Sequence, residues 1–513
     1  MNNSKLKLSI SYVFIFTICA KLLGFIREMV LSGFFGASGI SDAYLISQNI
    51  PGTIFLFVGT GLSTCYIPVY YRVLKSGGKE KAHSFTGNVL SIVFIFSAVV
   101  IALVWLFTPL VVKAFAYGFE GETLEYAIGF TRICILSLFF STIIYVYSSF
   151  IHVNDKFGLV AFSAIPNTLI VMLAIVLGAK VNIWLLSIVS VVAILAQAVI
   201  LFPEVHKLGF RYNPLSQYDK PTLKLFFGLI GPVIIGVSVN EINTLVDRTI
   251  ASQIAEGAIS ALTYANSLIQ LVQGGVVQPV VTVYYPSISS AVTERKYVEI
   301  ETNIKRIESF MLTLLLPISA FLMLFCKDIT KVLFERGAFG SEAIKMTAVS
   351  LLFYSIGICF VGLREPICRL FYAYSDTKTP MLNASIGLIV NIVLNIILSR
   401  LMGIGGLALA TSISALFSFV LLYFQARKKI SEIKIKIGVL NLLKDTIGTG
   451  FFIMGAFIIY SILKDVTIPL ISLVASGIIG LLVYVLIGYL LKNESIIMLV
   501  KMCSKIFHKL VHN

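Results

Sequence analysis

Long apolar runs separated by short polar loops make up most of this chain. Runs such as 89–112, 159–179, 183–202 and 469–491 contain no charged residue over about twenty positions. A helix of about 20 apolar residues spans a hydrocarbon core of about 30 Å. Lipid offers no hydrogen-bond partner to an open backbone, so such runs are expected to be helical. The pattern therefore predicts an all-α polytopic membrane protein.

The spacing of apolar runs and loops predicts about fourteen transmembrane helices. We expect them near 8–32, 43–71, 84–112, 124–151, 158–179, 183–203, 222–251, 259–290, 304–325, 343–373, 380–399, 405–426, 440–463 and 468–491. The mixed-charge segment 327–345 is expected to be an amphipathic loop or a short interfacial helix. The first run has no small-residue cleavage pattern, so we interpret it as a retained helix and not as a signal peptide.

Cations gather in the loops on one side of the predicted membrane. Both termini and every even-numbered loop share that side, so the positive-inside rule predicts that both termini are cytoplasmic. This distribution explains the net charge of +15 without a nucleic-acid partner. The seven cysteines and five histidines lack the spacing of a disulfide framework or a metal site. No P-loop motif occurs, which argues against ATP hydrolysis by that route.

Two sequence echoes share nearly the same separation along the chain. Arg27-x8-Gly36-x3-Ile40-Ser41 is matched by Arg248-x8-Gly257-x-Ile259-Ser260, and Phe150-x4-Asp155 by Phe371-x4-Asp376, a little over 220 residues later. The shared offset predicts a parallel repeat of two six-helix lobes, which in membrane transporters enclose a substrate cavity. We expect an N-terminal lobe at 1–204, a cytoplasmic linker at 205–221, a second lobe at 222–429, and two further helices with a basic tail at 430–513.

Several ionisable residues lie inside the predicted spans, where they are costly and indicate function. They are Lys21, Arg27, Glu28, Arg132, Asp247, Arg248, Arg364, Glu365 and Arg369. The repeat relates Arg27 to Arg248, so we expect both to face the interface between the lobes. Guanidinium groups bind phosphate in a bidentate manner, which implies an anionic substrate. Alternatively, these arginines extend to the lipid headgroups or pair internally, for instance Arg27 with Glu28.

Three side chains with amide or hydroxyl oxygens lie near the end of the second predicted lobe. Asn391 and Asn395 are four residues apart and share one helical face, and the next span carries Thr411. Together with Asp247 they offer hard oxygen ligands and one negative charge, which suit a sodium ion. The alternative is a packing role, because Asn and Thr also form hydrogen bonds between membrane helices.

Several unlinked motifs occur in the order found in one known family. They are Lys21-Leu-Leu-Gly-Phe-Ile-Arg27-Glu28, Ser41-Asp42-Ala43-Tyr44, Leu245-Val-Asp247-Arg248, Phe334-Glu-Arg-Gly-Ala-Phe339 and Asp376-Thr-Lys-Thr-Pro380. In these motifs the chain resembles the MurJ (MviN) type of lipid II flippase, in the multidrug/oligosaccharidyl-lipid/polysaccharide exporter superfamily. The resemblance covers essentially all of the first twelve spans.

The resemblance implies a transporter and not an enzyme. Its substrate would be an undecaprenyl-diphosphate-linked peptidoglycan precursor, moved from the inner to the outer leaflet of the bacterial cytoplasmic membrane by alternating access. The protein would act as a monomer, with the cell-wall synthesis machinery as a partner. By resemblance, Arg27 is a cavity arginine, Lys21 a nearby basic position and Asp42 the acidic residue of the first outer loop. The sodium ion would be held by Asp247, Asn391, Asn395 and Thr411.

Several positions depart from the family pattern. Phe55 and Leu56 stand where an arginine pair is usual, Thr60 where a glutamate is common, and Ser267 where another cavity arginine is expected. Either Arg248 and Arg132 supply the phosphate contact instead, or the substrate is another lipid-linked saccharide, such as an O-antigen or exopolysaccharide unit. A membrane polymerase or ligase would need larger outer loops for its acid and base residues, and a cation-coupled drug exporter would need an acidic cavity.

Overall fold

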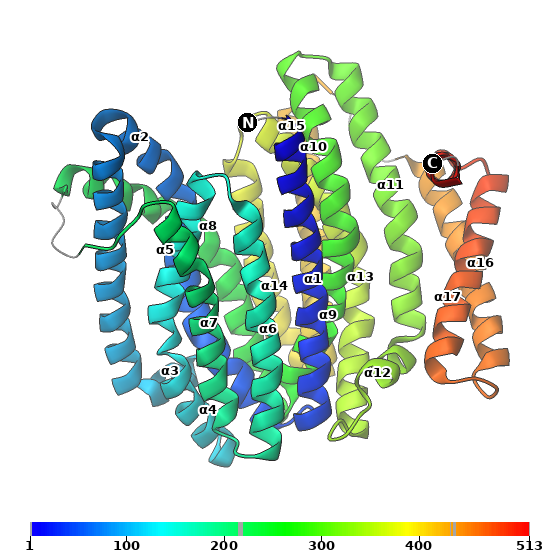
Figure 1. Ribbon diagram of the computed structural model, residues 1–513. Helices are drawn as coiled ribbons and strands as arrows, with labels where there is room; N and C mark the ends of the chain where they lie inside the picture. The colour runs from blue at the N-terminus through cyan, green and yellow to red at the C-terminus, as the bar shows by residue number, and fades with distance from the viewer. Residues whose placement is uncertain (1–2, 214–218, 431, 434–437, 512–513) are drawn as a thin grey trace. The chain divides into compact units, whose positions relative to one another are not determined.

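The computed structural model describes residues 3–213, 219–430, 432–433 and 438–511. Within these ranges the chain consists of helices joined by short connections, with no β-strand (Figure 1). The all-α polytopic class predicted from the apolar runs is confirmed. By packing, the described residues form two compact units: unit 1 comprises 1–260 with 336–340, and unit 2 comprises 261–335 with 341–513.

The helices follow the chain in a simple order. The first eight are α1 (Asn3–Phe35), α2 (Gly39–Leu106), α3 (Thr108–Phe115), α4 (Gly121–Cys134), α5 (Ser137–Val153), α6 (Phe157–Lys180), α7 (Leu185–Lys207) and α8 (Lys220–Ala251). After them come α9 (Ala258–Val272), the π-helix η1 (Gln273–Val277), α10 (Gln278–Thr293), α11 (Tyr297–Leu324), α12 (Cys326–Phe334), α13 (Ser341–Ala373), α14 (Lys378–Met402), α15 (Ile404–Lys429), α16 (Val439–Leu463), α17 (Pro469–Leu490) and α18 (Glu494–Val511).

Each of the predicted spans falls on helical structure. Helix α2 carries two of them, because its helical geometry is interrupted at Gly78, where φ is 74° and ψ is −175°. The fourth span is the pair α4 and α5, bent by 45°, and the eighth is α9, η1 and α10. Among the described residues ten helices are long and apolar enough to cross a membrane, or eleven with the bent pair, when α2 counts once. Helix α12 confirms the short helix expected in 327–345.

The order of elements confirms the parallel repeat. The series α1, α2, α3, the α4–α5 pair, α6 and α7 recurs as α8, the α9-to-α11 segment, α12, α13, α14 and α15. Asp155 and Ser375 have φ values of 61° and 60° at the matching turns. The sequence separation between Asp155 and Ser375 is one residue shorter than that between Phe150 and Phe371. The predicted lobe boundaries remain a prediction, since unit 1 extends to Ser260 and residues 214–218 of the linker lie outside the described ranges.

Each of the two matching turns forms an ion pair with the end of a later helix, and the positions of the cation and the anion are exchanged between the two units. In unit 1 the turn supplies the cation, since Lys156 pairs with Glu204 at the end of α7. In unit 2 the turn supplies the anion, since Asp376 lies 3.4 Å from Nζ of Lys429 at the end of α15. Hydrogen bonds from Thr379, assisted by Lys429, hold the pKa of Asp376 below its usual value. The repeat therefore preserves the tie between loop and helix end while the charges are exchanged.

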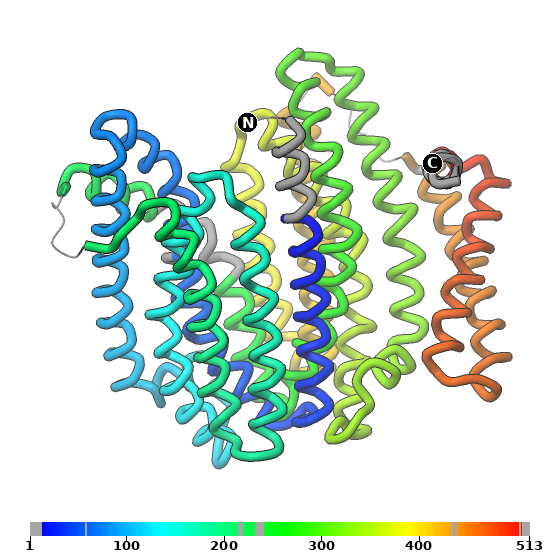
Figure 2. The backbone as a smooth tube through the Cα atoms, in the orientation of Figure 1, coloured from blue at the N-terminus to red at the C-terminus, as the bar shows by residue number. Residues whose placement is uncertain are grey.

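Helix α1 is anchored at its end by a distant loop. Helix α1 packs against α6 (Figure 2). At its end, the N–H of Ala338 donates to the carbonyl of Gly33 at 2.9 Å. Gly36 closes the helix with φ of +65°, and an added Cβ would lie 2.5 Å from the carbonyl oxygen of Ala338. The Phe334–Phe339 motif therefore serves, at least in part, to pack residues 336–340 against α1.

A buried carboxylate joins the last helices of unit 2 to α11. Asp445 on α16 is fully buried. It accepts hydrogen bonds from Thr313 Oγ1 at 3.0 Å, Tyr484 OH at 3.0 Å and Asn493 Nδ2 at 2.8 Å. A buried charge is tolerated when donors surround it in this way. This network links α11, α16, α17 and the start of α18.

Candidate functional site

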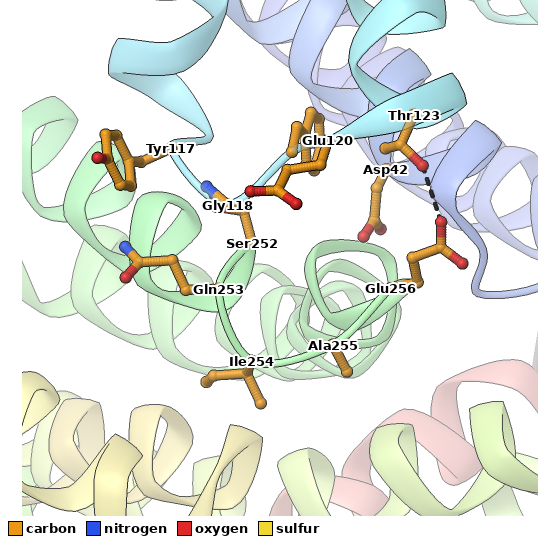
Figure 3. A pocket seen from close by; sticks show the side chains of 11 residues that line it. Asp42, Tyr117, Gly118, Glu120, Thr123, Ser252, Gln253, Ile254, Ala255 and Glu256 are labelled. Atoms are coloured by element: carbon orange, nitrogen blue, oxygen red, sulfur yellow. Dashed lines mark hydrogen bonds between the residues drawn. The ribbon is translucent and has the colours of Figure 1, made fainter.

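Unit 1 contains a polar cavity of about 450 Å³ where three of its loops meet (Figure 3). We call it the Asp42 pocket. Its polar lining comes from the start of α2, the loop between α3 and α4 with the start of α4, and the loop between α8 and α9: Asp42, Glu120, Thr123, Ser252, Gln253 and Glu256. These are the loops that the charge distribution predicts to lie outside the cell.

Asp42 is positioned by the first turn of α2 and is 1% exposed. Ser38 and Ser41 form a capping box that starts this helix, since the Ser38 N–H donates to Ser41 Oγ at 2.9 Å and the Ser41 N–H donates to Ser38 Oγ at 3.4 Å. The Asp42 carboxylate accepts hydrogen bonds from the N–H of Gly257 at 2.8 Å, the N–H of Ser260 at 2.7 Å and the Ser260 hydroxyl at 2.5 Å. It therefore caps the start of α9 from a different helix.

A second contact closes the same pocket. Thr123 Oγ1 donates to Glu256 Oε1 at 2.8 Å (Figure 3). An added Cβ on Gly39 would lie 2.1 Å from Thr123 Oγ1 and 2.7 Å from Glu256 Oε1. Because only glycine leaves that space, the start of α2 can approach both side chains. The loops of unit 1 are thus joined by two separate sets of polar contacts around Asp42 and Glu256.

The predicted phosphate-binding arginine of α1 is paired with its neighbour. Arg27 Nη2 and Nε lie 2.5 Å and 3.2 Å from Glu28 Oε1, and the Arg27 side chain is 40% exposed. Glu28 is buried, and its Oε2 accepts no hydrogen bond from the described residues. The internal pairing considered as an alternative is thus present. It uses one edge of the guanidinium, and Lys21, also on α1, is exposed.

The other predicted basic residues lie in different surroundings. Arg132 on α4 is exposed, and its guanidinium lies 5.3 Å from the centre of the Trp105 ring. Arg248 and Asp247, in the last part of α8, are half-buried and each has an interaction partner. Arg132 therefore lies against an aromatic side chain.

Three of the four predicted cation ligands lie together in unit 2. Asn391 and Asn395 are fully buried on α14. Asn395 Nδ2 donates to Asn391 Oδ1 at 2.7 Å, and Asn391 Nδ2 lies 3.4 Å from Thr411 Oγ1 on α15. Buried amide and hydroxyl oxygens fit the ligand preference of sodium, and they equally satisfy the packing role. Asp247, the charged member of the set, belongs to unit 1.

The structure also shows what occupies the positions that depart from the family pattern. Phe55 is buried against Tyr145, with ring centres 5.3 Å apart. The Ser267 hydroxyl donates to the carbonyl of Tyr264 in its own helix at 2.6 Å. Neither side chain can replace a guanidinium as a phosphate ligand.

One acidic residue that the sequence reasoning missed contacts Thr53, two residues before Phe55. Glu241 Oε2, on α8, accepts a hydrogen bond from Thr53 Oγ1 at 3.3 Å. Its signal was available, since it is a carboxylate within a predicted span.

The fold defines the class of protein. Similarity extends to a solved inward-facing MATE family transporter of the MOP superfamily, with a TM-score of 0.70 at 12% identity, over 80% of this chain and 94% of that one. A solved lipid II flippase MurJ in an inward closed conformation gives a TM-score of 0.81 at 24% identity, over 94% of this chain and 99% of that one. The chain thus has the helical fold of this transporter superfamily.

Sequence comparison identifies the family within that class. The family model described as lipid II flippase MurJ matches residues 31–478. The probable lipid II flippase MurJ of Thermotoga maritima is 30% identical over 485 residues, which cover 94% of this chain and 95% of the relative. The lipid II flippase MurJ of Burkholderia cenocepacia is 26% identical over 425 residues, with coverage of 81% and 82%. This chain belongs to the lipid II flippase MurJ family.

Proposed function

We propose that this protein is a flippase that moves lipid II, the undecaprenyl-diphosphate-linked peptidoglycan precursor, from the inner to the outer leaflet. The observation that carries the proposal is Arg27, a partly exposed guanidinium on α1, within the first predicted span. Such a group is costly in a membrane unless it has a partner. Glu28 occupies only the Nε and Nη2 edge of Arg27, so the remaining donors suit a phosphate oxygen.

Transport would proceed by alternating access of a diphosphate-binding site. Arg27, aided by Lys21 and Arg248, would hold the diphosphate, with Glu28 orienting Arg27. The contacts of Asp42 with Gly257 and Ser260 would tie the outer ends of the helices together in one state and separate in the other. No chemical bond of the substrate changes, so the protein acts as a transporter and needs no catalytic residue.

A sodium ion would bias this cycle. Asn391, Asn395 and Thr411 would supply neutral oxygen ligands, and Asp247 would supply the compensating charge. Where a carboxylate occupies the second asparagine position in some relatives, Asn395 removes one charge, so binding should be weaker here. The protein would reside in the bacterial cytoplasmic membrane as a monomer with cytoplasmic termini, in contact with cell-wall synthesis proteins.

An alternative substrate is favoured by one specific observation. Phe55 and Ser267 fill positions where arginines are usual, and neither can contact phosphate. Such a reduced positive charge would also fit a flippase for an O-antigen or exopolysaccharide unit, whose saccharide differs while the diphosphate is shared.

Complementation tests the proposal and separates the two substrates. Wild-type protein should restore growth and outer-leaflet lipid II in cells depleted of their own lipid II flippase. Arg27→Ala should abolish rescue, Arg27→Lys should retain part of it, and Arg400→Ala, at an exposed cation at the end of α14, should match wild type. Full rescue by Arg27→Ala would overturn the assigned role of Arg27, and failure of the wild type in well-expressing cells would overturn lipid II as substrate.

A further inference from the structure

Helix α13 of unit 2 carries three ionisable side chains that the proposed mechanism does not use. They are Arg364, Glu365 and Arg369, and the helix is apolar enough to cross a membrane. Arg364 Nη2 lies 3.5 Å from Glu365 Oε1, and the two side chains are 30% and 18% exposed. Two guanidiniums and one carboxylate therefore lie on this helix, which leaves a net charge of one positive unit.

Arg369 is held by aromatic rings and not by a carboxylate. Its guanidinium carbon lies 5.8 Å from the ring centre of Tyr285 on α10 and 5.9 Å from that of Tyr372 on α13. Rings at this distance stabilise a cation through their electron-rich faces. They also fix the orientation of the planar guanidinium.

Both arginines have a buried donor that no described residue satisfies. The Nε atoms of Arg364 and Arg369 are inaccessible to solvent and have no hydrogen-bond acceptor within the described ranges. A buried donor without an acceptor is costly, and more so when it carries charge. Two such atoms on one helix show that the positive charge of α13 is incompletely compensated by the described residues.

The two side chains can act on one small anion. They are five residues apart, which on an α-helix corresponds to about 7.5 Å along the axis and about 140° around it, so only the length of the arginine side chains can bring the two guanidiniums to one anion. Cys368 lies between them in the sequence. Long arginine side chains bridge that separation, and a phosphate or diphosphate offers several acceptor oxygens for two forked donors.

We infer that Arg364 and Arg369 form a second anion-binding site, which takes a phosphate group of the lipid-linked diphosphate. The inference rests on the proposed function and deepens it, since it names a phosphate contact in unit 2 in addition to Arg27. A further phosphate contact would compensate in number for the arginines that the family usually carries at Phe55, Leu56 and Ser267. Tyr285 and Tyr372 are positioning residues that keep the guanidinium of Arg369 flat.

Ligand binding to the purified full-length protein in nanodiscs tests the site. The probes are undecaprenyl diphosphate, undecaprenyl monophosphate and phosphatidylglycerol, each titrated against wild type, Arg364→Gln, Arg369→Gln and Arg369→Lys. Arg400→Gln is the matched control, because it removes an exposed cation from a neighbouring helix of the same unit. Charge-assisted hydrogen bonds predict that each glutamine variant binds undecaprenyl diphosphate about tenfold more weakly.

Variants of Arg369 and of Tyr285 separate the role of the guanidinium from that of the aromatic ring. Arg369→Lys keeps the charge without the planar fork, so affinity should fall between that of wild type and Arg369→Gln. Tyr285→Phe keeps the ring and should match wild type, whereas Tyr285→Ala should weaken binding of the diphosphate lipid. A purely structural role of Tyr285 would instead lower thermal stability and leave the affinity of the folded fraction unchanged.

The outcomes distinguish this inference from the proposed function. Wild-type affinity for undecaprenyl diphosphate in both glutamine variants would overturn the second site and leave the flippase proposal intact. Equal weakening for phosphatidylglycerol and the diphosphate lipid would assign the site to bilayer headgroups and overturn its role in substrate binding. A wild-type protein that binds neither undecaprenyl lipid would overturn both proposals.

Discussion

Removing the Asp42 carboxylate should release the start of α9 from the start of α2. Asp42→Ala deletes the acceptor for two backbone N–H groups and one hydroxyl. The Ser260 hydroxyl keeps a neighbour, since it lies 2.8 Å from Ser41 Oγ. The two N–H groups of Gly257 and Ser260 are left without their acceptor at buried positions.

The magnitude follows from these contacts. Each orphaned buried donor costs about 1–3 kcal/mol, and loss of the negative charge at a helix N-terminus adds about 0.3–1 kcal/mol. Together these terms lower the stability of the closed loop, relative to its open state, by about 2–7 kcal/mol. Since every 1.4 kcal/mol is about a factor of ten, the opening equilibrium should rise by at least about 30-fold. Asp42→Asn retains one acceptor oxygen and should show a smaller increase.

Hydrogen exchange followed by mass spectrometry measures this opening directly. Peptides covering 252–262 should exchange faster in Asp42→Ala by the factor given above, while peptides from α16 and α17 should not change. Glu120→Gln is the matched control, since Glu120 lines the same pocket and is exposed, and it should leave exchange within about threefold of wild type. If Asp42→Ala also stayed within that limit, the capping contact would not stabilise this loop.

Three further predictions concern positions away from the predicted substrate site. Gly36→Ala should lower the melting temperature in detergent, because its φ of +65° disfavours a side chain and the new Cβ would meet a carbonyl oxygen of residues 336–340; an unchanged melting temperature would contradict the geometry. Asp445→Ala should cost about 3 kcal/mol or more in chemical denaturation, because three side-chain donors lose a fully buried acceptor, and Asp445→Asn should cost less. The pKa of Asp376 is lowered chiefly by hydrogen bonds from Thr379, so its stabilising contribution is present above the ordinary carboxyl pKa of about 3.9 and is lost as the pH falls through the lowered value. The protection of 374–382 against hydrogen exchange, taken relative to the intrinsic rate at each pH, should therefore fall on acidification, and Thr379→Val should remove most of that fall.

The helical class and the positions of the spans could be predicted because they depend on local composition. A charge-free run of about twenty residues has few alternatives to a membrane helix. The repeat could be predicted because both copies keep the same spacing from arginine to glycine before their first loops and the same Phe-x4-Asp spacing. The break of α2 at Gly78 and the bend between α4 and α5 shift where helices begin and end. They leave the order of the predicted spans unchanged.

The candidate site was only partly predictable, since its contacts join residues far apart in the chain. Asp42 was named by resemblance, but its partners Gly257 and Ser260 are more than 200 residues away, and their role appeared only in the fold. Arg132 was grouped with the substrate residues because it is charged within a span, yet it lies against Trp105. Glu241 was missed although it also lies within a span, because no motif marks it.

The sequence by itself determined that the chain is a membrane protein of repeated helices and supplied the motifs of its family, because hydropathy and spacing are properties of neighbouring residues. Only the tertiary structure decided which charges have partners. It paired Arg27 with Glu28, surrounded Asp445 with donors and left the Nε atoms of Arg364 and Arg369 without acceptors among the described residues. The physical reason is that the stability of a charge in a low-dielectric environment depends on the few ångströms around it, and those distances are set by packing between helices.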